Sequence, residues 1–180
     1  MPLRIPLTAP RLGEGGKIPL MYSRPISLAS PFARAPASPP TRWALLLGFS
    51  GLIPFVGLSA VSWMQGGILQ AQALFALLAY GATILSFLGA IHWGLALRDP
   101  ADPPRWMLVW GVVPSLVAWV ALLWGTPGGL WLLAAGLWAC FAIDRKVYPR
   151  FAVQGWLGMR LALTALASLS CLAAALGLMR

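Results

Sequence analysis

Acidic side chains are scarce in this 180-residue chain. Only four residues are Asp or Glu, and charged residues make up 9% of the sequence against 59% hydrophobic ones. A soluble domain usually carries about a quarter charged residues, so the composition excludes an ordinary water-soluble globular protein. In a soluble protein the formal net charge of +9 would suggest a nucleic-acid partner. Here the basic residues flank apolar runs, so membrane topology and anionic lipid headgroups explain them without nucleic acid.

Groups suited to catalysis or cofactor binding are also few. The single histidine cannot supply two axial haem ligands or a His-Glu-x-x-His zinc site. The chain has no glycine-rich phosphate loop, and no ionisable residue lies in the middle of an apolar run. The two cysteines, Cys140 and Cys171, are expected at depths too different for a disulfide. We therefore assign no catalytic residue and no metal ligand, and leave any cofactor unknown.

Long apolar runs dominate what is present. They cover residues 43–64, 71–97, 106–124, 130–143 and 157–179. A helix needs about 20 residues to cross the hydrocarbon core, and continuous rather than alternating apolarity favours helices over barrel strands. We predict an all-α integral membrane helical bundle with five transmembrane helices within residues 43–180. The run over 130–143 is short, so its helix must extend into the neighbouring residues.

Positive charge is distributed unevenly around these runs. Twelve of the thirteen Lys and Arg residues precede the first run, separate the second from the third, or lie between the fourth run and the start of the fifth. Basic residues of short loops stay in the cytoplasm. The pattern predicts that the N-terminus is inside and the C-terminus outside. The expected location is the bacterial inner (plasma) membrane, with the mitochondrial inner membrane as the alternative.

Residues 1–42 differ from the rest of the chain. They are rich in proline and arginine and contain one acidic residue, Glu14. A segment with so little apolar surface to bury is expected to be disordered. Two other interpretations are open. An arginine-rich, acid-poor composition also fits an organelle transit peptide, and Met21 is an alternative start of the protein.

Small residues recur every fourth position along the second run. The predicted helix-packing face consists of Ala82, Ser86, Gly89, Ala90 and Gly94. Such a face lets another helix approach closely, and replacing Ala90 with leucine is expected to disrupt that packing. The alternative interpretation is a groove for a ligand or partner. Pro54 and Pro114 lie inside the first and third runs, where they are expected to kink the helices.

Four polar residues are predicted to gather at the cytoplasmic side. His92 is near the end of the second run, Arg98 follows it, Asp144 ends the fourth run and Arg160 begins the fifth. An ionisable group inside a membrane span suggests function, so this cluster is a candidate site for an anionic headgroup or a partner. The alternative is a set of interfacial anchors that pair loosely and contribute little individually.

Two segments resemble an uncharacterised membrane-protein family. They are Gly51-Leu-Ile-Pro-Phe55 and the stretch from Tyr80 to Gly94, Tyr-Gly-Ala-Thr-Ile-Leu-Ser-Phe-Leu-Gly-Ala-Ile-His-Trp-Gly. The family occurs in proteobacteria and, as the transmembrane protein 69 family, in eukaryotes, where its members look mitochondrial. The resemblance implies a small multi-helix membrane protein and supplies no catalytic residues.

These observations favour a structural function. We expect an accessory, scaffold or assembly subunit that packs in the lipid bilayer against a larger membrane complex. This expectation rests on the small-residue face and on the missing catalytic groups. The alternative is a binder or carrier of a hydrophobic small molecule or lipid, with His92, Arg98 and Asp144 at its cytoplasmic mouth.

Overall fold

Helices make up nearly all of the structure, a computed structural model that describes residues 39–64, 66–98 and 104–179. All of these residues belong to one compact unit, Arg34–Arg180. Its elements are α1 (Arg42–Ser50), α2 (Leu52–Ser62), α3 (Ile68–Ala96), α4 (Arg105–Trp124), α5 (Gly128–Val147), the 3-10 turns η1 (Tyr148–Phe151) and η2 (Gln154–Trp156), and α6 (Leu157–Gly177). With α1 and α2 taken as one interrupted helix, the described residues form five helices. The all-α prediction is confirmed.

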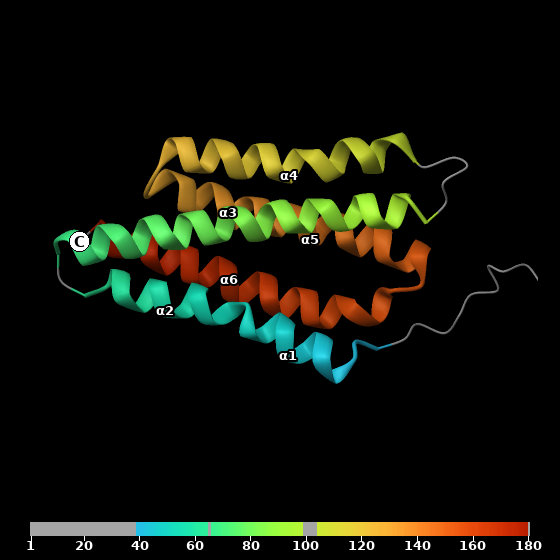
Figure 1. The fold of residues 1–180 in the computed structure, drawn as a ribbon, viewed down its shortest axis with the longest axis horizontal. Helices are drawn as coiled ribbons and strands as arrows, with labels where there is room; N and C mark the ends of the chain where they lie inside the picture. The colour runs from blue at the N-terminus through green and yellow to red at the C-terminus, as the bar shows by residue number, and fades with distance from the viewer. Residues whose placement is uncertain (1–38, 65, 99–103, 180) are drawn as a thin grey trace, which may run out of the picture. The chain divides into compact units, whose positions relative to one another are not determined.

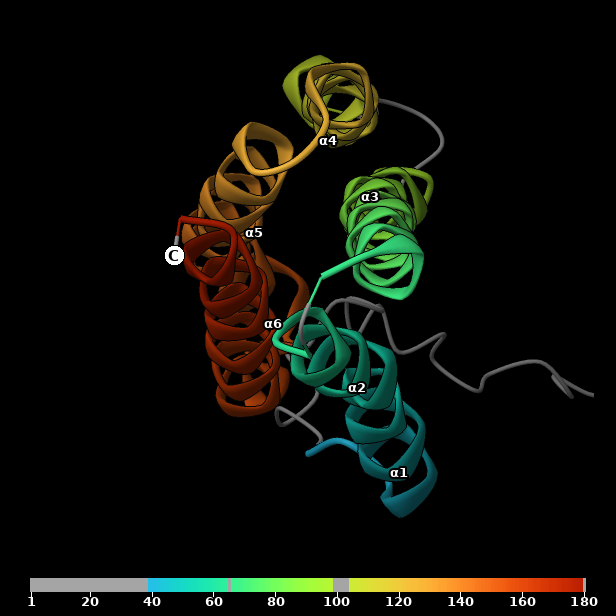
Figure 2. The same ribbon diagram turned by 90° about the vertical axis from the view of Figure 1, so that its left-hand side faces the viewer.

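The helices run antiparallel to their chain neighbours (Figure 1). The view along their axes shows them arranged around a common core in the order α2, α3, α4, α5 and α6, with α6 returning to α2 (Figure 2). Helix α3 also packs against α5 and α6. The core between them is aliphatic, with Leu77, Leu85 and Leu133 fully buried. Cys140 and Cys171 are buried free thiols, as expected from the sequence.

Four helices of the described part are long and apolar enough to cross a membrane. They are Arg42–Ser62, Ile68–Ala96, Arg105–Trp124 and Gln154–Gly177. Helix α5 is as long as α4, at 20 residues, but its last turn contains Asp144, Arg145 and Lys146, and it is not among the four. It begins before residue 130 and continues past residue 143, which is the extension that the short fourth run required.

The first span is interrupted at Gly51, between α1 and α2. The cause lies three residues further on, because Pro54 has no N–H to donate to the carbonyl of Ser50. Tyr80 of α3 donates a 2.9 Å hydrogen bond from its hydroxyl to the carbonyl oxygen of Gly51. The Tyr80 ring also meets the Phe55 ring edge to face, with centroids 5.1 Å apart. Helix α4, by contrast, runs unbroken through Pro114.

Replacing Tyr80 with phenylalanine tests this contact. The variant keeps the ring packing and removes only the hydroxyl, so the free energy of unfolding is expected to fall by about 0.5–1.5 kcal/mol, the net contribution of one hydrogen bond. Thermal unfolding in detergent measures the change. Thr83→Val is the matched control, because that hydroxyl is exposed and bonds its own helix at the Tyr80 carbonyl. An equal loss in both variants would contradict a structural part for the Tyr80 hydroxyl.

Only part of the predicted small-residue face is packed. Ala82 and Gly89 are buried and Ser86 is half-buried, whereas Ala90 and Gly94 are exposed. The reason is geometric: four residues turn a helix by about 400°, so a repeat of four drifts by about 40° at each step. Gly89 stays in line with Ala82, but Ala90 and Gly94 rotate out of the interface. Replacing Ala90 with leucine would add atoms at the surface of the bundle, so the structure gives no reason for this substitution to disrupt packing between its helices.

Candidate functional site

A buried ion pair joins the last turn of α5 to the first turn of α6. The Arg160 side chain donates to Oδ2 of Asp144 from both Nε, at 2.8 Å, and Nη2, at 2.6 Å. Asp144 is 2% exposed and Arg160 is 7% exposed. Each charge sits at the helix end where the helix dipole disfavours it, the anion at a C-terminus and the cation at an N-terminus. The attraction between the two charges therefore offsets the unfavourable interaction of each one with the dipole of its helix.

His92 completes this cluster from α3. It is fully buried, its Nε2 lies 3.5 Å from Oδ1 of Asp144, and its Nδ1 lies 3.4 Å from the carbonyl oxygen of Leu88. The Nε2 contact is at the limit of hydrogen-bond length and lacks hydrogen-bond alignment, so it is an electrostatic contact. We call His92, Asp144 and Arg160 the buried triad.

Three of the four residues of the predicted cytoplasmic cluster thus meet, and Arg98 does not join them. Arg98 follows the end of α3 and is exposed. It lies six residues beyond His92, which turns it about 240° around the helix axis, away from the face that His92 shares with the core. Asp99 and Asp102, its neighbours in the sequence, fall outside the described residues.

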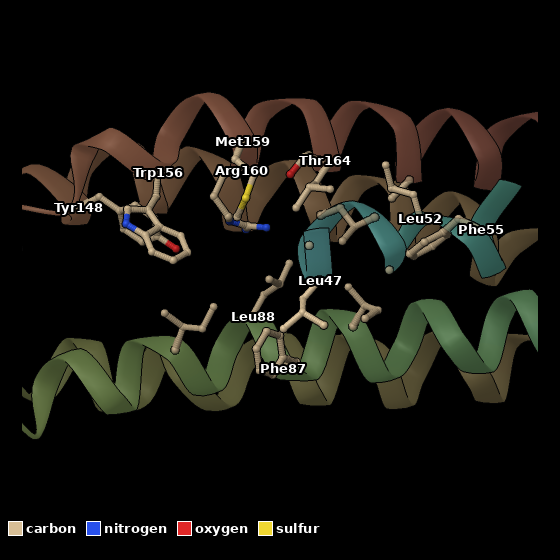
Figure 3. A pocket seen from close by; sticks show the side chains of 17 residues that line it. Leu47, Leu52, Phe55, Phe87, Leu88, Tyr148, Trp156, Met159, Arg160 and Thr164 are labelled. Carbon is tan, nitrogen blue, oxygen red and sulfur yellow. The ribbon is translucent and has the colours of Figure 1, made fainter. Parts of the chain in front are cut away.

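A pocket of about 300 Å³ lies beside the triad, between α1–α2, α3 and α6 (Figure 3). Its walls are mostly aliphatic and aromatic side chains, among them Leu52, Phe55, Phe87, Leu88 and Met159. This pocket was not predicted from the sequence. Its lining comes from segments far apart in the chain, and its apolar members look like ordinary residues of a span. No signal in the sequence distinguishes them.

Polar side chains line the same pocket, namely Arg160, Tyr148 and Thr164, and the indole of Trp156 lines it as well. Burial, and next the charge of Asp144, raise the pKa of Tyr148 to about 12, so this phenol is neutral at physiological pH. The Tyr148 hydroxyl also interacts with the Arg160 guanidinium. The Thr164 hydroxyl is buried and has no hydrogen-bond partner in the described structure. The pocket is therefore apolar along its length and polar at one place, beside the triad.

Comparison with known proteins gives a family and distant relatives. Residues 40–176 match the family model described as "Protein of unknown function (DUF3429)". Transmembrane protein 69 of Xenopus tropicalis is 46% identical over 82 residues, which is 44% of this chain and 32% of that protein. Transmembrane protein 69 of Mus musculus is 37% identical over 82 residues, 44% of this chain and 33% of that protein. The match thus spans about a third of each relative's length. No solved structure matches the chain significantly.

Proposed function

The chain belongs to the DUF3429 family of proteins of unknown function, and we propose from its own geometry that it binds a hydrophobic small molecule or lipid in the pocket beside the buried triad. The observation that carries this proposal is the pocket itself, apolar along α2, α3 and α6 with a few polar groups at one place. Small-molecule sites commonly combine these two properties, and about 300 Å³ is at the lower end of their usual size.

The outer edge of the pocket supports access from the bilayer. Leu47 and Phe87 line the pocket and are 70% and 62% exposed. This chain is a multi-pass membrane protein with long apolar spans, so apolar side chains that are exposed on these spans face lipid. A lipophilic molecule would enter between α1 and α3 without crossing water. A water-soluble substrate would have to leave its hydration shell to follow the same path.

The topology belongs to the same proposal. The described basic residues outside the triad lie at one end of the helices: Arg42, Arg98, Arg105, Arg145, Lys146 and Arg150. The positive-inside rule places that end in the cytoplasm, with α5 as a fifth span, the N-terminus inside and the C-terminus outside. The triad and the polar part of the pocket are then near the cytoplasmic face. The proposed location is the bacterial inner membrane, and the mitochondrial inner membrane is the alternative.

Replacing Ile84 with tryptophan tests the pocket. Ile84 is half-buried on α3 and lines the pocket, so the larger ring should occupy the space of a ligand. The protein is extracted gently from native membranes, and native mass spectrometry identifies what stays bound. We expect the wild-type protein to retain a hydrophobic compound at close to one molecule per chain, and Ile84→Trp to lose most of it.

Ile53→Trp is the matched control, because it makes the same change at a side chain that is 71% exposed on α2 and outside the pocket. It should retain the compound as the wild type does. Equal retention by both variants would contradict a site in this pocket. Isolation without any bound compound, but within one larger membrane complex, would favour the accessory or assembly subunit expected from the sequence.

A further inference from the structure

We propose that the pocket selects an uncharged ligand, a carbonyl compound with an aliphatic or isoprenoid body, whose oxygen accepts hydrogen bonds from Thr164 and Arg160. This inference rests on the proposed function and adds the chemistry of the ligand. Two properties of the pocket wall indicate the class of ligand: its charge is already balanced, and some of its hydrogen-bond donors are unused.

The charge of the polar wall is already balanced. Arg160 carries the positive charge, and Asp144 matches it at hydrogen-bond distance. From α3 the neighbouring group is His92, and from η1 it is the neutral Tyr148. With a neutral imidazole the wall has no net charge. An anionic ligand would compete with Asp144 for the guanidinium, and a cationic one would meet Arg160, so either would add an uncompensated charge to a buried site.

The hydrogen-bond donors of this wall are not all used. An arginine offers five N–H donors. Asp144 takes two of those of Arg160, and the Tyr148 contact needs one more at most. Thr164 adds a hydroxyl that is buried without a partner, although a helical threonine usually can bond the carbonyl of the preceding turn. A buried donor without a partner is costly, and a ligand oxygen would satisfy it.

The side chains around these donors define the rest of the ligand. Figure 3 shows Arg160 and Thr164 on α6 opposite Phe87 and Leu88 on α3. Away from the donors, apolar walls continue toward Leu52 and Phe55 of α2. A molecule held there has one oxygen at the triad and a hydrocarbon body along the helices. An ester or a quinone with a long apolar chain fits this description, and a free fatty acid or a phospholipid phosphate at the same position does not.

Three probes with the same hydrocarbon length separate these possibilities: dodecane, methyl dodecanoate and dodecanoate. Purified protein in detergent is titrated with each, and native mass spectrometry gives the apparent Kd. We expect the ester to bind about fivefold more tightly than the alkane, a factor that one net hydrogen bond supplies. Thr164→Val should weaken ester binding by about the same fivefold and leave alkane binding unchanged, and Thr164→Ser should restore the preference for the ester.

Folding does not confound this test. Valine has nearly the shape of threonine and removes a buried hydroxyl that lacks a partner, so Thr164→Val should unfold at the wild-type temperature or above. Tighter binding of dodecanoate than of the ester would overturn the inference in favour of an anion site. Unchanged ester affinity in Thr164→Val would overturn it as well. Failure of the proposed function is a separate result, in which no probe binds the wild-type protein and Ile84→Trp changes nothing.

Discussion

Replacing Asp144 with leucine is expected to lower the free energy of unfolding by about 3–5 kcal/mol, because the variant leaves Arg160 charged, buried and without its partner. Arg160 is 7% exposed and gives two hydrogen bonds to the carboxylate. Both side chains are almost fully buried, so little water reaches them to replace these bonds. Chemical or thermal unfolding of the purified protein in detergent measures the loss, and reduced yield from membranes is expected as well.

The double variant Asp144→Leu/Arg160→Met distinguishes the cost of leaving one charge without its partner from the cost of replacing both residues. Apolar residues of similar size often replace a buried ion pair at little cost, so the double variant should recover most of the lost stability. Lys146→Met, an exposed charge two residues from Asp144, is the control and should stay within about 0.5 kcal/mol of the wild type. A double variant less stable than the single one would show that each residue contributes through contacts other than the pair.

Replacing Gly89 with alanine is expected to cost about 1–3 kcal/mol, the range for overpacked interfaces. A Cβ at this position would overlap the carbonyl oxygen of Gly111 on α4. The obstacle is backbone, which cannot rotate aside as a flexible side chain does, so α3 and α4 must separate. The same separation would stretch the 2.8 Å hydrogen bond that Trp93 Nε1 donates to the carbonyl of Leu108. Unfolding in detergent measures the cost.

Gly94→Ala is the matched control on the same helix, because a Cβ there meets nothing within 4 Å. Alanine is the better helix former, so this variant should be as stable as the wild type or slightly more stable. If both glycine variants behaved alike, helix propensity rather than close approach of α3 and α4 would explain the result.

The helices could be predicted from the sequence because hydropathy and length determine them. The predicted 43–64 and 157–179 became Arg42–Ser62 and Leu157–Gly177, and no end moved by more than two residues. The fourth apolar run, 130–143, is shorter than the helix that contains it, Gly128–Val147, since the last turn of that helix contains charged residues that lower hydropathy without ending the helix. Arg145 and Lys146 are exposed at the end of α5, where cations interact favourably with the helix dipole.

The candidate site could be predicted only in part. The clustering of His92, Asp144 and Arg160 follows from the antiparallel order of the helices, which brings the ends of α3 and α5 to the same side of the bundle as the start of α6. Whether such residues form a close pair or loose anchors depends on helix rotation, which hydropathy does not determine. The pocket depends on how three helices diverge from one another, and that is a property of side-chain packing over the whole bundle. An apolar residue that lines a cavity and one that fills the core have the same signature in sequence.

The ion pair also bears on how the chain enters the membrane. Asp144 and Arg160 are 16 residues apart, on consecutive helices joined by η1 and η2, so they can meet before either helix is inserted. An isolated Asp or Arg raises the free energy of inserting a helix, by about 2.5–3.5 kcal/mol at the centre of a span and by less near its end, where this pair lies. A hairpin whose two charges are already paired avoids much of that cost. Helix α5 is not among the four candidate spans of the described residues, and we expect the translocon to insert it together with α6 as a single helical hairpin.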